Sequence, residues 1–270
     1  MKRLLFLVIL LSLPPSAFSL PEDVPFVVTP DNVTLEMLKL ANVGPKDYVI
    51  DLGSGDGRIV IVAAKRFGAR GLGVEIVPDL VTKSRENARA AGVDDKVEFR
   101  EEDLYKTDMS QATVVTMYLL PEVNLQLRPR VLALPPGTRI VSHDWDMGEW
   151  KPDVSNTVIA PEKIVGRDKW SVVHLWIVPA RIGGTWCRVG KAGQLDLQQK
   201  FQAISGTYSA GGSKQELEGR MEGARLITSD FELEFKGETL RVARADRPFA
   251  ALRGATFRPA AAGRCGPAKG

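Results

Sequence analysis

The chain has 270 residues, of which 44% are hydrophobic and 26% are charged, so it can bury a large core and form one large domain plus a small one. Its 36 Lys and Arg residues against 33 Asp and Glu residues leave a formal charge of only +3, and no basic run is interleaved with aromatic residues. This composition indicates a globular protein, and no nucleic acid is expected as a partner.

The N-terminus has the three regions of a secretory signal. Met1-Lys2-Arg3 is followed by an apolar run from Leu4 to Leu13 and by the small-residue pattern Ala17-Phe18-Ser19. The apolar run is shorter than the roughly 20 residues that span a bilayer. We therefore expect a signal peptide over residues 1–19 and an exported protein, periplasmic or membrane-associated; an uncleaved anchor is the competing interpretation.

Residues 20–182 alternate between strand and helix patterns. A first helix is expected after Pro30, ending near Asn42. Five apolar strands then alternate with three helices: the expected strands cover residues 48–52, 71–75, 97–100, 113–118 and 139–142, and the expected helices cover 58–67, 78–91 and 121–132. Two further strand patterns, 157–165 and 170–178, lack a helix between them and predict an antiparallel edge hairpin. The predicted fold is α/β, a Rossmann-like sheet of seven strands.

Beyond residue 183 the pattern changes to short strands separated by Gly-rich turns. We predict a small all-β domain over residues 183–262, followed by a tail over 263–270. The two cysteines of the chain, Cys187 and Cys265, lie near the two ends of this segment. They predict either one intramolecular disulfide in an oxidising compartment or two unrelated thiols.

The most specific motif is the Gly-rich segment between the first strand and the next helix. Gly53, Gly55 and Gly57 permit close approach of a ligand to the backbone at the start of the helix. A dinucleotide site has the spacing G-x-G-x-x-G, whereas the third glycine here comes one residue early. Asp51 precedes the loop, where its charge opposes phosphate and favours a cation. Both features favour S-adenosylmethionine (SAM) over NAD and argue against an NAD-dependent oxidoreductase.

Two more acidic residues follow the next two strands. Glu75 ends the second strand about 20 residues beyond the loop, where a carboxylate accepts hydrogen bonds from ribose hydroxyls. Asp103 follows the third strand, placed to meet the adenine amino group. Each acid alone is equally well explained as a solvated strand end. Together with the glycine loop, however, the acids predict one cofactor crevice.

Residues Pro25 to Ala180 resemble a class I SAM-dependent methyltransferase, with Asp51 to Gly57 as its first motif. Within that superfamily, the segments Phe26 to Pro30, Asp51 to Ile59 and Ser142 to Trp145 are similar to the branch that contains mitochondrial protein-lysine methyltransferases, which modify membrane-protein subunits. The resemblance implies SAM as cofactor and a protein lysine as acceptor, and it adds Thr29 and Ser54 to the expected cofactor-binding residues. The C-terminal β domain is not part of the pattern.

Candidate residues for the methyl acceptor follow the fourth and fifth strands. Tyr118 or Trp145 is expected to pack against an amine acceptor, and Glu122, Asp144 or Asp146 to attract its ammonium group. His143 is either a base or a structural residue. No metal is required, because transfer needs an aligned nucleophile and exclusion of water. Three further tryptophans, Trp150, Trp170 and Trp176, are predicted to be core.

The sequence thus predicts a methyltransferase that acts on an amine, either a protein lysine or a small molecule, with an envelope or membrane protein as an expected partner. The Asn-Pro-Pro-Tyr signature of amide and nucleobase N-methylation is absent from the sequence. The competing hypothesis is an exported non-catalytic binding protein that retains a SAM-type nucleoside site.

Overall fold

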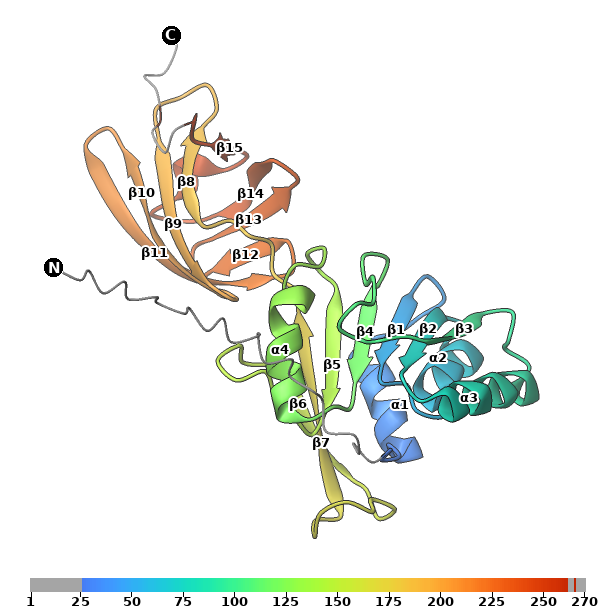
Figure 1. Cartoon of the computed structure of the whole chain (residues 1–270). Helices are drawn as coiled ribbons and strands as arrows, with labels where there is room; N and C mark the ends of the chain where they lie inside the picture. The colour runs from blue at the N-terminus through green and yellow to red at the C-terminus, as the bar shows by residue number, and fades with distance from the viewer. Residues whose placement is uncertain (1–25, 262–264, 266–270) are drawn as a thin grey trace, which may run out of the picture.

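The computed structural model describes residues 26–261 and Cys265, and the predicted signal peptide lies outside these residues. The described chain forms a helix-covered mixed sheet followed by an all-β barrel (Figure 1). This arrangement confirms the predicted fold class.

The sheet has seven strands in the order β3-β2-β1-β4-β5-β7-β6. The first five are parallel, and β7 is antiparallel to both β5 and β6. Their bounds are β1 Tyr48–Leu52, β2 Arg70–Glu75, β3 Val97–Glu101, β4 Val114–Met117, β5 Arg139–His143, β6 Val154–Ile159 and β7 Trp170–Ile177. The helices are α1 Asp31–Leu40, α2 Arg58–Phe67, α3 Pro78–Ala91 and α4 Pro121–Val131.

Alternating side chains of the central strands bury both faces of the sheet. Val49 and Val114 pack with α1 and α2 on one face, whereas Ile50 and Val115 pack with Leu127 of α4 on the other. This two-sided burial explains why the central strands are continuous apolar runs in the sequence. It leaves their polar residues at the strand ends, where the candidate site lies.

The edge hairpin differs from its prediction. Its first strand, β6, covers Val154–Ile159 rather than residues 157–165, because the chain turns at Pro161, which has no N–H to offer a partner strand. Ile164 and Val165 therefore lie in the exposed turn of the hairpin. Trp170 is also 45% exposed, so its prediction as a core residue was wrong, while Trp150 and Trp176 are fully buried as predicted.

The C-terminal strands close into an eight-stranded antiparallel barrel in the order β10-β11-β12-β13-β14-β15-β8-β9. Large apolar side chains fill its interior, among them Trp186, Phe231 and Phe257. Cys187 and Cys265 form a disulfide with 5.4 Å between their Cα atoms. The strands are β8 Gly184–Arg188, β9 Gln194–Lys200, β10 Ala203–Ala210, β11 Ser213–Glu222, β12 Arg225–Thr228, β13 Phe231–Lys236, β14 Thr239–Ala245 and β15 Thr256–Pro259.

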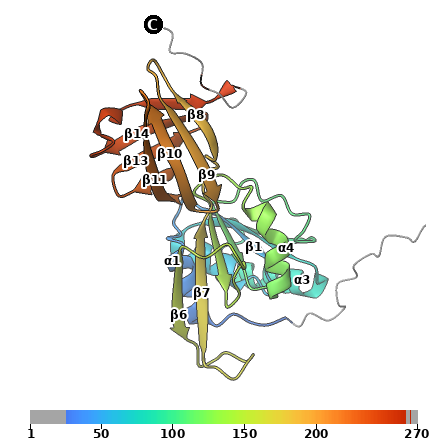
Figure 2. The same cartoon turned by 90° about the vertical axis from the view of Figure 1, so that its left-hand side faces the viewer.

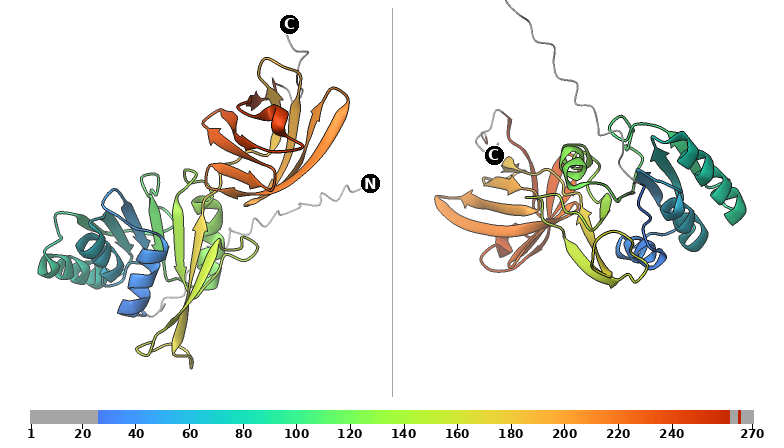
Figure 3. Two further views of the ribbon diagram at one scale, coloured as in Figure 1. Left: turned by 180° about the vertical axis from the view of Figure 1, so that it is seen from behind. Right: turned by 60° about the horizontal axis from the view of Figure 1, so that its bottom comes forward.

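The barrel lies at the end of the sheet where the parallel strands begin. Ile177, at the end of β7, pairs with Arg139 at the start of β5, and the Ala180 amide then donates to the carbonyl of Gly223 in the barrel. Figures 2 and 3 show the barrel at one end of the sheet and the turn of the β6–β7 hairpin at the other. The carboxyl ends of the parallel strands therefore face away from the barrel. Within the described residues, no helix has the length and apolarity needed to cross a membrane.

Candidate functional site

The loop between β1 and α2 requires its glycines. Gly53, Gly55 and Gly57 have φ angles of 73°, 54° and 81°, in the left-handed region that other residues rarely adopt. A Cβ atom on Gly55 would lie 2.1 Å from the ring of Phe26, and one on Gly57 would lie 2.7 Å from the ring of Phe99. Both the backbone angle and the close packing exclude a larger residue.

Hydrogen bonds fix the loop to β2 and α3. The amides of Gly53 and Ser54 both donate to the carbonyl of Val74 at 2.9 Å. The Gly55 amide donates to Glu75 Oε2 at 2.9 Å, and the Ser84 hydroxyl donates to the Gly55 carbonyl at 2.8 Å. The loop is therefore held from two elements before any ligand binds, which lowers the entropic cost of binding.

Asp51 lies beneath the loop at the end of β1. Its side chain is almost fully buried, with 2% of the residue exposed, and its Oδ1 accepts a 2.7 Å hydrogen bond from the Thr116 hydroxyl on β4. Burial raises the pKa of Asp51 to about 7, the hydrogen bond from Thr116 opposes this rise, and the charges of Glu75 and Asp56 add to it. A cationic group placed beside this carboxyl would relieve the cost of ionising it.

Glu75 and Asp103 follow the next two strands along the same edge. Glu75 Oε1 accepts hydrogen bonds from the amides of Ile76 and Val77, so both of its oxygens are positioned by backbone groups. Asp103 Oδ1 accepts from the Tyr105 amide at 2.9 Å in a local turn. Because β1, β2 and β3 are neighbours in the sheet, the three acids lie at adjacent strand ends, as expected.

These groups fit SAM. The Ser54 hydroxyl is buried and has no hydrogen-bond partner among the described residues, so the loop retains an unsatisfied polar atom. Asp51 would stand near the cationic end of the cofactor, Glu75 near its ribose and Asp103 near its base. When bound, SAM supplies a methyl group activated by a positively charged sulfur.

A second set of residues forms a surface that we call the acceptor wall, consisting of Thr29, Tyr118, His143 and Asp144. The ring of Tyr118, just after β4, stacks on His143 at the end of β5 with 3.9 Å between centroids. The Thr29 hydroxyl lies 3.2 Å from His143 Nδ1 on this wall, and the contact of Thr29 with the cofactor stays a prediction. Its carbonyl accepts from Arg58 at 3.0 Å, which connects the wall to the glycine loop.

His143 is fully buried, and both ring nitrogens have hydroxyl partners. Nδ1 meets Thr29 and Nε2 meets Ser171 at 2.8 Å. Burial lowers the pKa of His143 to about 4; the charge of Asp144 opposes this shift and that of Lys163 adds to it. This geometry offers no free nitrogen to an acceptor, so of the two alternatives left open by the sequence it favours the structural one.

The candidate acids of the acceptor side differ in their surroundings. Asp144 has a φ of 63°, and both its amide and its Oδ1 are bonded to the backbone of Val172. Its Oδ2 lies 2.7 Å from Lys163 Nζ. Asp146 accepts from the Gly148 amide, and Glu122 is exposed in the first turn of α4. Of these three acids, only Asp144 meets an ammonium group within the part of the chain that the structure describes.

Sequence reasoning missed three residues of this site. Thr116 pairs with Asp51 in the β1–β4 register, a signal that appears once the two strands are aligned in parallel. Phe26 covers Gly55, although it was noted only as part of the lead-in. Lys163 comes from the distant hairpin, and no local pattern indicates its contact with Asp144.

Comparison with known proteins identifies the family of the chain. A family model described as the ANTKMT methyltransferase domain matches residues 51–154. A protein-lysine N-methyltransferase of Saccharolobus islandicus is 43% identical over 131 residues, which are 48% of this chain and 81% of that protein. The mouse adenine nucleotide translocase lysine N-methyltransferase is 36% identical over 48% of this chain, but the match covers only 57% of that enzyme.

A solved structure shares both sequence and fold with the first part of the chain. It is described as an RNA methyltransferase from Salinibacter ruber in complex with S-adenosyl-L-homocysteine, and it is 54% identical with a TM-score of 0.52. The match covers 58% of this chain and 96% of that one. The chain therefore belongs to the class I SAM-dependent methyltransferases, and SAM is its cofactor.

Proposed function

We propose that this enzyme transfers the methyl group of SAM to the side-chain amine of a protein lysine. The observation that carries the proposal is the contact between Asp144 and Lys163, because it shows a lysine ammonium held 2.7 Å from a carboxylate of the acceptor wall. The protein-lysine methyltransferases among the relatives support the same acceptor class.

The residues of the wall suit this reaction. A protonated lysine has no lone pair, so the amine must lose a proton before it attacks the methyl carbon. Asp144 holds the Lys163 ammonium at the wall, and Tyr118 with His143 forms a stacked aromatic surface beside it. The backbone bonds of Asp144 to Val172 hold its carboxylate at a fixed position.

The surroundings of the wall support a protein acceptor. Large apolar side chains are exposed before α1, after β2, β4 and β5, and from the turn of the β6–β7 hairpin to the first residue of β7. Exposed apolar side chains of this kind are typical of protein contacts. These side chains are Phe26, Ile76, Val77, Leu120, Trp145, Ile164, Val165 and Trp170. The alternative of a non-catalytic binding protein gains no support from the relatives.

The test is transfer of an isotopically labelled methyl group from SAM to protein and RNA fractions of a cell extract, followed by acid hydrolysis. We expect labelled methyl-lysine in the protein fraction. The Asp51→Asn variant, which lacks the buried carboxyl, serves as the inactive control. Label found only in RNA would assign the chain to the activity named for the Salinibacter ruber protein, and label found only in free small amines would exclude a protein acceptor.

We also propose that the enzyme is exported, with an envelope or membrane protein as the acceptor. The disulfide between Cys187 and Cys265 supports an oxidising compartment. N-terminal sequencing of the protein from separated cell fractions tests this proposal. A periplasmic protein that begins at Leu20 is expected, whereas an intact Met1 in the cytosol with reduced cysteines would overturn it.

A further inference from the structure

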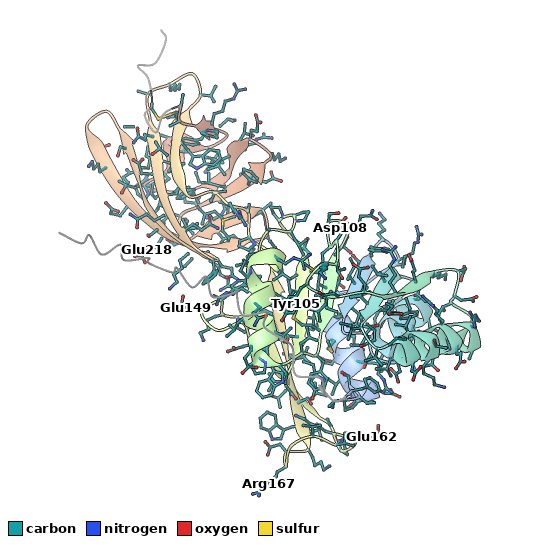
Figure 4. All side chains as sticks on the ribbon, viewed as in Figure 1. Tyr105, Asp108, Glu149, Glu162, Arg167 and Glu218 are labelled. Atoms are coloured by element: carbon teal, nitrogen blue, oxygen red, sulfur yellow. A yellow bond between two sulfur atoms is a disulfide. The ribbon has the colours of Figure 1, made fainter. Side chains whose placement is uncertain are left out.

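In the turn of the β6–β7 hairpin, one lysine is largely buried while the two apolar residues that follow it are exposed. Lys163 has only 13% of its side chain exposed, while the next two residues, Ile164 and Val165, are 73% and 45% exposed. Lysine is almost never buried without a partner, and apolar residues usually take the buried places. A specific contact must therefore hold Lys163 inward. Figure 4 labels Glu162 and Arg167 of the same turn, at the end of the molecule opposite the barrel.

The Lys163 ammonium contacts two oxygen atoms that accept hydrogen bonds. Nζ lies 2.7 Å from Asp144 Oδ2 and donates to the carbonyl of Trp170 at 2.9 Å. The turn is braced around it, since the Lys163 amide donates to Ala160 and Lys169 Nζ donates to the Lys163 carbonyl. Two of the three N–H directions of the ammonium are thus directed to fixed oxygens.

One of these two partners, Asp144, belongs to the acceptor wall. Asp144 Oδ2 is also 3.5 Å from Nε2 of His143, and the His143 ring stacks on Tyr118. The Lys163 amine therefore lies against the same surface that an incoming lysine must reach. It is delivered there by its own chain, so its local concentration at the wall exceeds that of any free protein.

We propose that Lys163 is itself a methyl acceptor, and that the enzyme methylates this residue within its own chain. The inference rests on the proposed lysine methyltransferase function and deepens it. After one proton leaves to solvent, the neutral amine keeps its hydrogen bonds to Asp144 and Trp170 and has its lone pair in the third direction. The lone pair forms the bond from Nζ to the methyl carbon, and the bond from sulfur to that carbon breaks.

The electron pair of the broken bond stays on sulfur, which becomes the neutral thioether of S-adenosylhomocysteine. The positive charge passes to the secondary ammonium of methylated Lys163. One methyl group is transferred and one proton is released in each turnover, and no oxidant, reductant or further reactant is consumed.

The test uses the purified full chain with SAM carrying a deuterated methyl group and no added acceptor, followed by peptide mass spectrometry. We expect the label at Lys163 and not at Lys169, the exposed lysine of the same turn. The initial rate of labelling per chain should be independent of enzyme concentration, because the transfer takes place within one chain. Lys163→Arg should remove the label, and the matched variant Lys169→Arg should keep it.

Two mixtures separate this inference from the proposed function. Label on an added protein but never on Lys163 overturns self-methylation alone. If neither Lys163 nor any added protein is labelled although SAM is bound, the inference and the proposed function are overturned together. The second mixture combines the Lys163→Arg variant, as enzyme, with the Asp51→Asn variant, as acceptor. If Lys163 of the acceptor chain is labelled as fast as Lys163 of the wild-type protein alone, transfer within one chain is refuted.

A readout without SAM tests the placement of the amine. Acetic anhydride should acetylate Lys163 at least several-fold more slowly than Lys169 in the wild-type protein, and Asp144→Asn should remove this protection while circular dichroism shows an intact fold. Equal rates at the two lysines in the wild-type protein would overturn the proposed contact.

Discussion

The hydroxyl of Thr116 donates a 2.7 Å hydrogen bond to the buried carboxyl of Asp51 across the neighbouring strands β4 and β1. This bond is a direct polar contact beneath the glycine loop, and burial nevertheless raises the pKa of Asp51 to about 7. The cofactor site therefore contains a carboxyl group whose ionisation at neutral pH depends on what binds beside it.

Asp51→Asn should abolish SAM binding and change the pH dependence of stability. The folded pKa of Asp51 is raised from 3.8 to about 7, so the folded state binds more protons than the unfolded state between these values. Stability of the wild type must then fall as pH rises through this window, by a few kcal/mol at most. Thermal unfolding of both proteins across this range measures the effect, and parallel curves would contradict it.

Binding of SAM should release protons near pH 7. The positively charged cofactor favours the ionised form of Asp51 and lowers its pKa, so a fraction of the chains loses a proton on binding. Calorimetric titration in two buffers with different ionisation enthalpies gives the number released. Asp51→Asn is unsuitable as the control because it removes the site, so the comparison is wild type at about pH 9, where release from Asp51 should vanish. A release that does not change with pH would refute the assignment.

Gly55→Ala should weaken SAM binding severely. The new Cβ meets the ring of Phe26 at 2.1 Å, and the φ of 54° costs a non-glycine residue about 1–2 kcal/mol in addition. Adding Phe26→Ala should restore part of the affinity, because it removes the clash and leaves the backbone strain. Gly44→Ala is the matched control, since a Cβ there meets nothing within 4 Å. Full affinity in the single Gly55 variant would exclude the loop as the cofactor site.

His143 should remain uncharged in the folded protein at neutral and mildly acidic pH. Its pKa is lowered from 6.5 to about 4 by burial, so the unfolded state takes up a proton first as pH falls. Stability from this group is complete above pH 6.5 and is lost as pH falls toward about 4. Nuclear magnetic resonance of the imidazole tests this directly; a titration midpoint near 6.5 would show that the ring is solvated and available as a base.

Gln202→Ala should lower stability without a loss of SAM affinity. The Gln202 amide accepts from Trp150 Nε1 and donates to Asp153 Oδ2. Its removal leaves the buried Trp150 N–H without its acceptor at a cost of about 1–3 kcal/mol, whereas Asp153 keeps its contacts with Ile177 and Arg220. Thermal unfolding and SAM titration measure the two effects. Because the barrel lies away from the carboxyl ends of the strands, a large loss of SAM affinity in the folded variant would show an unexpected coupling between barrel and site.

The sequence by itself determined the strand–loop–helix unit from Tyr48 to Phe67 and the acids that follow β1, β2 and β3. These features are local, because the spacing of apolar residues specifies each strand or helix and the glycines specify the angles of their own turn. Parallel strands then bring their carboxyl ends to one edge, so the cofactor residues could be grouped before the structure was known.

Only the tertiary structure decided the acceptor wall. The pairing of Asp144 with Lys163, the stacking of Tyr118 on His143 and the turn of Thr29 toward His143 join segments that are far apart in the chain. Such contacts depend on the order of the strands and on where the hairpin turns. No local pattern contains this information, and for the same reason the exposure of Trp170 and the closure of the C-terminal barrel had to be seen in the folded chain.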